Sequence, residues 1–378
     1  MLSSFSIQGY RKFKEFQIED LSRINFFVGK NNMGKTTILE AVYGWACGFN
    51  LHPFFTFSLP RGYGINQTNS YHLADIILTA MNDQEKIPFQ FSFAGINDGE
   101  DIKFTHTVKP GELFKNFNRA LSVSLDNNNE FIAKEHKGDI QSSNSLPFPM
   151  NTVTIAEWEI QKNDQLESKV SYRIVLPNLF FPMQKPQIMA QYIDILAHRD
   201  VMRNVQIYSA LKKEGLLEIF VEELQSVFSE VKGIDMIPYP DGSQSPISIQ
   251  RTNGQYLPID SFGDGMRHWY HLIGSLLMCH DGIACVDEID VTQHPTAQQE
   301  LCHSLIKYAR KFNVQLFITT HNLEFIDRLL AAWNTDDLKS EDDIRIITAK
   351  EYDNQVKTRN LSVEKALYAR KNYQMELR

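Results

Sequence analysis

A glycine-rich loop near the N-terminus constrains the fold of this chain more than any other feature. Residues 29–36 read Gly-Lys-Asn-Asn-Met-Gly-Lys-Thr and fit the pattern G-x-x-x-x-G-K-[ST]. The apolar run 24–28 precedes the loop, and a run with helical character follows it from Thr37. This order of strand, loop and helix is the setting in which such a loop holds phosphate groups. The sequence therefore predicts an α/β fold in which 24–28 is a central strand buried on both faces.

The residue types in this loop suit a nucleoside triphosphate and a magnesium ion. Glycines let backbone N–H groups turn toward phosphate oxygens, and the following helix adds unpaired N–H groups and the positive end of its dipole. Lys35 supplies a cation, and the hydroxyl of Thr36 can ligate Mg²⁺. The residues predicted to contact the nucleotide are Gly29, Asn31, Asn32, Gly34, Lys35, Thr36 and Thr37.

The composition indicates a globular protein with a sizeable buried core. The chain has 378 residues, of which 43% are hydrophobic and 22% are charged. No apolar stretch approaches the roughly 18 residues of a membrane span, and the N-terminal segment lacks the apolar core of a signal peptide. A cytoplasmic location without a membrane partner is the default expectation. The cysteines are interpreted as small core residues rather than disulfide or zinc ligands. They are Cys47, Cys279, Cys285 and Cys302.

The charge balance bears on nucleic acid as a partner. A formal net charge of −8 and a pI near 5.8 argue against a protein that coats nucleic acid through bulk positive charge. A local basic surface remains compatible with these values. Two short clusters, 11–14 and 212–213, are interpreted as solvated faces.

Hydrophobic patterning divides most of the remaining chain into three parts. Residues 1–28 read as strands that include a hairpin, and the helix after the glycine-rich loop is expected to end near Gly48. From about 50 to 173, short alternating runs between polar loops predict an antiparallel β subdomain. From 187 to 232 the pattern is helical, with an apolar stripe that we interpret as core packing. The stripe consists of Leu217, Phe220, Val221, Leu224, Val227, Phe228 and Val231.

A second glycine-containing turn stands at the start of a later helix. Ser261, Gly263 and Gly265 lie in this turn, and the apolar residues that follow share one helix face. Such a turn can bind an anion, although an ordinary helix cap has the same appearance.

Two carboxylates follow the apolar strand 283–286. Because α/β proteins bind ligands at the carboxyl edge of parallel strands, Asp287 and Glu288 are expected beside the glycine-rich loop. Asp287 suits the Mg²⁺ shell, and Glu288 suits a general base that deprotonates an attacking water. Both are therefore candidate site residues, Asp287 as a metal ligand and Glu288 as a catalytic residue.

The last part of the chain adds one candidate catalytic residue. A buried-looking strand, 314–318, leads to His321, which at a strand end can sense or stabilise a terminal phosphate. Residues 344–349 are expected to form an edge strand. A short helix is expected to start near Ser362.

These features, in chain order, resemble the motifs of ABC-type ATPases. The segments 29–36, 261–265, 287–288 and His321 resemble the Walker A loop, the signature motif, the Walker B strand and the switch histidine. The chain is most similar to the branch related to Rad50, SMC and RecF proteins, and within it to OLD-like ATPases of the AAA_15 and AAA_21 group. The resemblance covers roughly residues 1–50 and 190–378.

Three local features carry the resemblance to the OLD-like group. They are Tyr10-Arg11-Lys12-Phe13 with Ile24-Asn25-Phe26, the Ser-x-Gly-Asp-Gly-x-Arg form of the signature ending in Arg267, and Asp287-Glu288-Ile289 followed by His294-Pro295. The chain departs from the group at Gln293, preceded by Thr292, where members usually carry leucine before the His-Pro pair. This segment resembles the D-loop, which crosses a dimer interface. Gln67 and Gln90 are the candidates for a Q-loop glutamine.

The resemblance implies a fold and a division into domains. The fold is an ABC-type P-loop ATPase head with a mixed sheet, an antiparallel β subdomain and a helical subdomain. Residues 1–50 and 235–378 would form the ATPase core, 51–185 the β-rich part of the lobe, and 186–234 the helical subdomain.

The resemblance also implies an active state. ATP and Mg²⁺ would be sandwiched in a head-to-tail homodimer, with Ser261, Gly263 and Gly265 acting on the nucleotide of the other copy. Higher oligomers are compatible with this arrangement. ATP binding would then be coupled to dimer closure.

The resemblance leaves the biological role open between two main hypotheses. About 57 residues follow His321, too few for the Toprim nuclease domain that OLD-like proteins often carry. The first hypothesis is thus a slow, regulatory ATPase that controls a separate effector, a nuclease or toxin, in antiphage defence. The alternative is a RecF-like or SMC-like DNA repair protein, which would need a basic strip. A transporter subunit is least compatible with the signature form.

Overall fold

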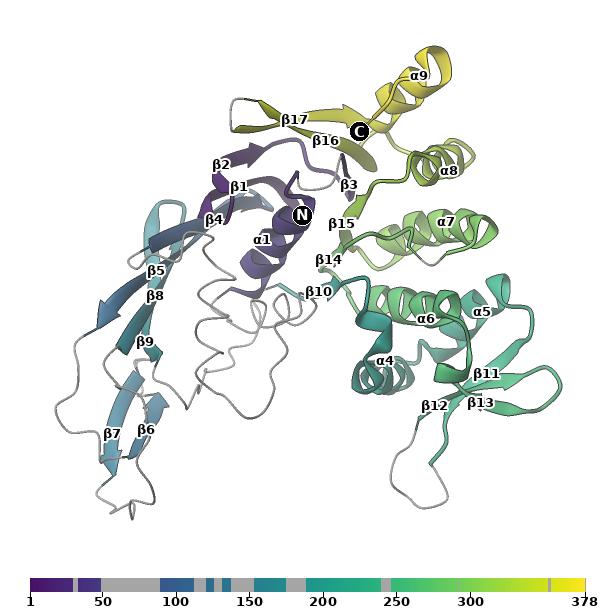
Figure 1. Ribbon diagram of the computed structural model, residues 1–378, viewed down its shortest axis with the longest axis horizontal. Coiled ribbons are helices and arrows are strands. Elements are labelled where there is room, and N and C mark those ends of the chain that lie inside the picture. Colours follow the sequence, from purple (N-terminus) through teal and green to yellow (C-terminus); the bar gives the residue numbers. More distant parts are fainter. Residues whose placement is uncertain are drawn as a thin grey trace, which may run out of the picture.

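A mixed six-stranded sheet forms the centre of the protein in the computed structural model (Figure 1). Its strand order is β10-β14-β15-β3-β16-β17, and neighbours are parallel except β16 and β17. The strands are β3 (Ile24–Val28), β10 (Ala190–Ile193), β14 (Ile283–Val286), β15 (Gln315–Thr320), β16 (Ile344–Tyr352) and β17 (Gln355–Ser362). The structure describes residues 1–29, 33–48, 89–111, 120–125, 131–136, 153–174, 188–238, 246–291, 293–352 and 355–377.

The central strands are buried on both faces, as predicted for 24–28. Phe26 of β3 packs into the core beneath the helices of one face, whereas Phe27 packs into the core of the opposite face. Ala284 and Cys285 of β14 divide between the two cores in the same way. Because both faces are covered, these strands read as continuous apolar runs rather than alternating ones.

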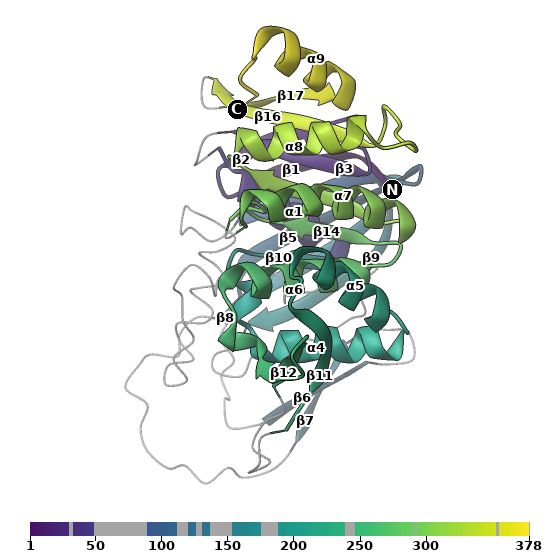
Figure 2. The ribbon, with the colours of Figure 1, turned by 90° about the vertical axis from the view of Figure 1, so that its right-hand side faces the viewer.

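Helices cover the two faces of the central sheet. On one face, α1 (Lys35–Cys47) packs between the central sheet and an outer sheet. On the other face, α6 (Asp264–Leu277), α7 (Pro295–Lys311) and α8 (Leu323–Asn334) lie side by side (Figures 1 and 2). The last helix, α9 (Val363–Tyr373), contacts α8 and β17. Thus α1 and α6 belong to opposite faces of the sheet.

The outer sheet contains antiparallel strands in the predicted region 50–173, and it also includes β1 and β2 from the N-terminal segment. Its order is β2-β1-β4-β5-β8-β9, and every neighbouring pair is antiparallel. Its strands are β1 (Leu2–Tyr10), β2 (Phe13–Ile18), β4 (Phe89–Asn97), β5 (Glu100–Gly111), β8 (Val153–Lys162) and β9 (Gln165–Ile174). A separate hairpin joins β6 (Ala120–Leu125) to β7 (Phe131–His136).

A small helical region with its own sheet lies beside α6. Phe220 and Leu224 are fully buried, so core packing explains the apolar stripe here. The elements are the 3₁₀ turns η1 (Ala197–Arg199) and η2 (Ile259–Ser261), helices α4 (Val201–Lys213) and α5 (Leu217–Val227), and strands β11 (Val231–Met236), β12 (Ile247–Arg251) and β13 (Tyr256–Pro258).

Two secondary-structure expectations are wrong. The segment 187–232 is not wholly helical: its last residues, from Val231, begin β11, and at its start β10 pairs with β14 in the central sheet. The strand β10 has only four residues, and periodicity alone cannot separate so short a run from a helix. The strand at 344–349 is not at an edge, because β16 lies between β3 and β17. The true edge strand is β17. It could not be predicted from an apolar pattern, because polar Lys, Thr, Arg and Asn side chains that are exposed or half-buried occupy its middle.

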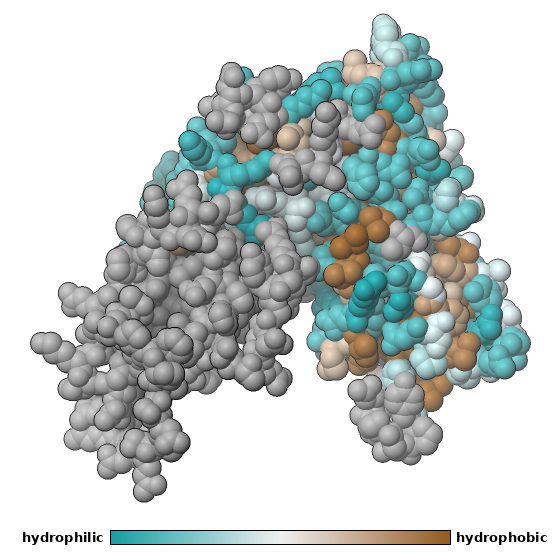
Figure 3. Space-filling model, in the orientation of Figure 1, coloured by the Kyte–Doolittle hydropathy of each residue, from teal (hydrophilic) through white to brown (hydrophobic). Residues whose placement is uncertain are grey.

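The expectations for two helix ends and for the cysteines are confirmed. Helix α1 ends at Gly48, and the Ser362 side chain caps α9 by accepting a hydrogen bond from the backbone of Lys365. All four cysteines are buried and free. No helix among the described residues is long and apolar enough to cross a membrane. Hydrophilic residues cover most of the α7–α9 side of the face drawn in Figure 3.

A buried histidine lies in the core of the outer sheet. The ring of His106 stacks on Trp158, with centroids 4.0 Å apart, and meets Phe91 edge-on. His106 is 1% exposed. Burial disfavours the charged imidazolium and lowers the pKa of His106 to about 3.

We expect His106 to make the protein less stable in acid. In the unfolded chain its pKa is about 6.5, so that state binds more protons below this pH, and stability falls as the pH drops from 6.5 toward 3. Between pH 7 and pH 5 the expected loss is about 2 kcal/mol. Urea unfolding of the wild type and His106→Leu at both pH values measures it. An equal loss in both proteins would show that His106 does not contribute.

Candidate functional site

The glycine-rich loop connects the central strand β3 to α1. Gly34 precedes α1 with φ 87° and ψ 17°, a left-handed conformation that favours glycine. The Nζ of Lys35 donates to the Gly29 carbonyl at 2.7 Å and so closes the loop. Thr36 and Thr37 lie in the first turn of α1, where backbone N–H groups have no partner within the helix. Asn31 and Asn32 lie outside the described residues.

The β1–β2 hairpin packs against this loop. A Cβ atom at Gly34 would lie 2.6 Å from Cζ of Phe13 and 2.7 Å from Cε of Lys12. Arg11 forms a 2.6 Å ion pair with Glu40 of α1, and their side chains are 4% and 2% exposed. The interpretation of the 11–14 cluster as a solvated face is therefore wrong for Arg11. Its partner on α1 is 29 positions away, so only the tertiary structure could reveal the pair.

Asp287 lies opposite Thr36, as predicted. The Thr36 hydroxyl is 3.2 Å and 3.0 Å from the two Asp287 carboxylate oxygens. The Thr319 hydroxyl, at the end of β15, donates to the same carboxylate at 2.5 Å. Thr319 is not among the site residues that the sequence predicts. The only signal for it was its position at the carboxyl end of a buried strand.

Glu288 has an unusual backbone conformation. Its φ is 50°, which is uncommon for a residue other than glycine, and such conformations cluster at functional sites. Its backbone N–H donates to the Thr319 hydroxyl at 2.8 Å. Thr319 therefore fixes both acidic residues at the carboxyl edge of the sheet.

These groups fit a magnesium ion and a nucleotide phosphate. Mg²⁺ is commonly held by one or two protein oxygens together with substrate phosphates and water. The Thr36 hydroxyl and the Asp287 carboxylate face each other and can supply those protein oxygens. Burial lowers the pKa of Lys35, whereas nearby Glu288 and Asp287 act in the opposite direction.

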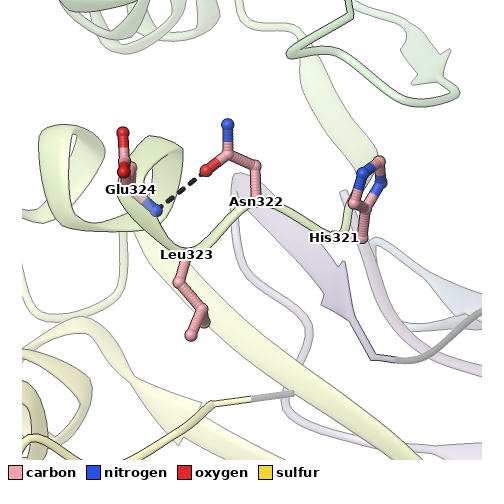
Figure 4. Close-up of a pocket in the computed structure, with 4 residues that line it drawn as sticks. All are labelled: His321, Asn322, Leu323 and Glu324. Atoms are coloured by element: carbon pink, nitrogen blue, oxygen red, sulfur yellow. Dashed lines mark hydrogen bonds between the residues drawn. The ribbon is translucent and has the colours of Figure 1, made fainter.

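His321 lies on the exposed loop between β15 and α8. A shallow pocket of about 330 Å³ is lined by residues 321–324 (Figure 4). Asn322 caps α8 there by accepting from the backbone N–H groups of Glu324 and Phe325. His321 is thus solvent-accessible and follows the strand whose Thr319 binds Asp287.

The turn formed by residues 261–265, here called the signature turn, is exposed at Ser261 and Gly263 and half-buried at its other three residues. Ser261 ends η2, Gly263 precedes α6, and a Cβ at Gly263 would meet no atom within 4 Å. Asp264 contacts Arg267 directly, and Arg199 lies 3.7 Å from it. Desolvation raises the pKa of Asp264, but these cations and His198 hold it below its ordinary value overall.

The Q-loop candidates remain unassigned to the site. Gln67 lies outside the described residues. Gln90 is an exposed residue of β4, opposite Thr107 in the outer sheet.

The phosphate loop and the two strand-end carboxylates beside it define a P-loop ATPase. The family model described as "AAA domain, putative AbiEii toxin, Type IV TA system" matches residues 24–327. The chain belongs to this family, AAA_21, and is an ATPase.

Curated and solved proteins show more distant similarity. A Helicobacter pylori (strain ATCC 700392 / 26695) protein named ATP/GTP phosphatase is 21% identical over 347 residues, covering 87% of each chain. A structure of an SmcHead bound to the C-winged helix domain of ScpA aligns with a TM-score of 0.47 and 13% identity, covering 97% of this chain and 99% of that chain. The SMC head domain from Thermotoga maritima aligns with a TM-score of 0.40 and 13% identity, covering 96% and 99% of the two chains.

Proposed function

We propose that this ATPase binds ATP and Mg²⁺ between two copies of itself in a head-to-tail homodimer. One observation carries the proposal. The exposed signature turn precedes α6, whereas the P-loop precedes α1 on the opposite face of the central sheet (Figure 1). Nucleotide phosphates held by one copy's P-loop would meet the Ser261, Gly263 and Gly265 backbone of the other copy.

The proposed arrangement couples ATP binding to association. Each nucleotide gains a second set of phosphate contacts only when both copies are present, so ATP favours the closed dimer. Asp264 at the start of α6 would repel phosphate. Arg199 and Arg267 beside it reduce that repulsion.

Hydrolysis in this site would depend on the chain's own groups in defined roles. Lys35 binds terminal phosphate oxygens, and Thr36 and Asp287 hold Mg²⁺, which neutralises phosphate charge. The Glu288 carboxylate orients the attacking water and accepts its proton as the water oxygen bonds to the terminal phosphorus, while the bond from that phosphorus to the bridging oxygen breaks and ADP leaves. His321 is proposed to contact the released terminal phosphate.

The biological role we propose is a slow ATP-dependent sensor or scaffold for a separate effector protein in antiphage defence. The family description names a toxin and a toxin–antitoxin system, which supports a chain that works with a second protein. The chain's net charge of −8 counts against the alternative, an SMC-like or RecF-like DNA clamp. A toxic or nuclease gene beside this one would support the first role, and recombination genes the second.

We expect ATP, but not ADP, to convert the protein from monomer to dimer. Sedimentation velocity with either nucleotide and Mg²⁺ measures this, and specific ATPase activity should rise with protein concentration. A monomer with ATP and concentration-independent activity would contradict the proposal. Salt-sensitive binding to duplex DNA, measured by fluorescence anisotropy, would instead favour the DNA clamp.

A further inference from the structure

The loop between β14 and α7 is hydrogen-bonded to the signature turn of the same copy. This loop comprises residues 287–294, of which Thr292 lies outside the described residues. The side-chain Nε2 of Gln293 donates to the Gly265 carbonyl at 3.1 Å. The Nδ1 of His268, one turn into α6, lies 3.1 Å from the Val291 carbonyl and must donate, because a carbonyl only accepts. Gln293 and His268 are 8% and 1% exposed.

The same loop is tied to the phosphate site. It begins with Asp287, which binds Thr36 and Thr319. Farther along, Asp290 accepts from the Thr320 hydroxyl at 2.5 Å, beside His321. The Gln298 amide donates to the carbonyls of Asp290 and Gln293, which fixes the loop backbone between these points. Hydrogen bonds and the backbone of the loop together thus connect the P-loop to the signature turn within one copy.

We propose that Gln293 is a positioning residue that holds the signature turn in register with the β14–α7 loop. The inference rests on the proposed dimer, in which that turn completes the partner's site. Leucine at this position cannot donate to the Gly265 carbonyl, and glutamate would place a negative oxygen against it. Gln293 therefore links a copy's own phosphate site to the surface that it presents to the other copy.

Stabilisation of the folded chain does not by itself account for a glutamine at position 293. Among the described residues, Gln293 Oε1 is buried without a hydrogen-bond partner. A buried polar atom left unpaired lowers stability. Gln293→Leu should therefore melt at the wild-type temperature or above it, while the contact that orients the signature turn is lost.

Mixed dimers separate the effect of Gln293→Leu on the partner's active site from its effect on the active site of the same copy. A Lys35→Ala subunit in large excess over an intact subunit gives dimers whose active site combines the intact P-loop with the signature turn of the Lys35→Ala subunit. Gln293→Leu is placed either on the Lys35→Ala subunit or on the intact one. Gln299→Leu, an exposed substitution on α7, is the matched control in both positions.

We expect kcat to fall about tenfold when Gln293→Leu is on the Lys35→Ala subunit. A tenfold change corresponds to about 1.4 kcal/mol, which is the contribution of one hydrogen bond. On the intact subunit the loss should stay within about twofold of the Gln299→Leu control. The KM for ATP should change less than kcat does, because the intact P-loop still supplies its own contacts to the nucleotide.

Two kinds of result would overturn the inference. Equal losses in both positions, or none in either, would mean that Gln293 does not act through the partner's site. A mixture of Lys35→Ala and wild type with no more activity than the dilute wild type alone would overturn the proposed dimer, and this inference with it. The first kind leaves the dimer standing, so the two failures are distinguishable.

Discussion

Glu288→Gln is expected to slow ATP hydrolysis by about 10³-fold while ATP still binds, because loss of a general base typically removes 10²–10⁴-fold. The carboxylate follows β14 at the carboxyl edge of the sheet, where the Thr319 hydroxyl fixes its backbone. Glutamine keeps the shape of the side chain but cannot accept the proton of the attacking water. ATP should therefore persist in the site, and the proposed dimer should accumulate.

Phosphate release at saturating ATP measures the first effect, and sedimentation velocity measures the second. Glu218→Gln, an exposed substitution on α5, is the control and should leave both unchanged. Rapid turnover by Glu288→Gln would remove Glu288 from the catalytic assignment.

Lys35→Ala is expected to weaken ATP binding by at least about 100-fold. Charge-assisted hydrogen bonds contribute about 1.5–3 kcal/mol each, and Lys35 is placed to make such bonds to phosphate oxygens. The substitution also removes the 2.7 Å bond between Lys35 and the Gly29 carbonyl, which closes the loop before nucleotide binds. The lost bonds to phosphate and the lost closure of the loop both weaken the binding of ATP.

Isothermal titration with ATP and Mg²⁺ measures this loss directly. Lys232→Ala, an exposed substitution on β11, controls for the removal of one positive charge. The variant should keep its thermal stability, since a buried ammonium group carries a desolvation cost. Unchanged ATP affinity would mean that the loop does not bind phosphate, and the site assignment would then fail at its first step.

The positions of Lys35 and Glu288 could be predicted from the sequence to different extents. The P-loop could be read directly from residues 29–36, because its strand, turn and helix are consecutive in the chain. The carboxylates at 287 and 288 could be placed near it from the general behaviour of parallel strands. Thr319 could not be assigned, because its bond to Asp287 depends on β14 and β15 being neighbours.

Strand order and polar side chains account for the expectations that were wrong. The four-residue β10 gave too little periodicity to be separated from the helices that follow it. The strand β16 had the apolar pattern of a strand, but its interior position depends on pairing with β3, more than 300 residues earlier. Arg11 appeared solvated because its buried partner, Glu40, is on another element.

The sequence by itself determined the kind of chemistry, nucleotide binding and hydrolysis, and the local strands, turns and helices that carry the residues for it. Turn glycines, apolar periods and a strand followed by two carboxylates are local signals, and each follows from the backbone preferences of consecutive residues. Only the tertiary structure decided which of these elements face one another. It placed the signature turn and the P-loop helix α1 on opposite faces of one sheet, and it joined Gln293 to Gly265. Contacts of this kind depend on packing between distant segments, which no local pattern specifies.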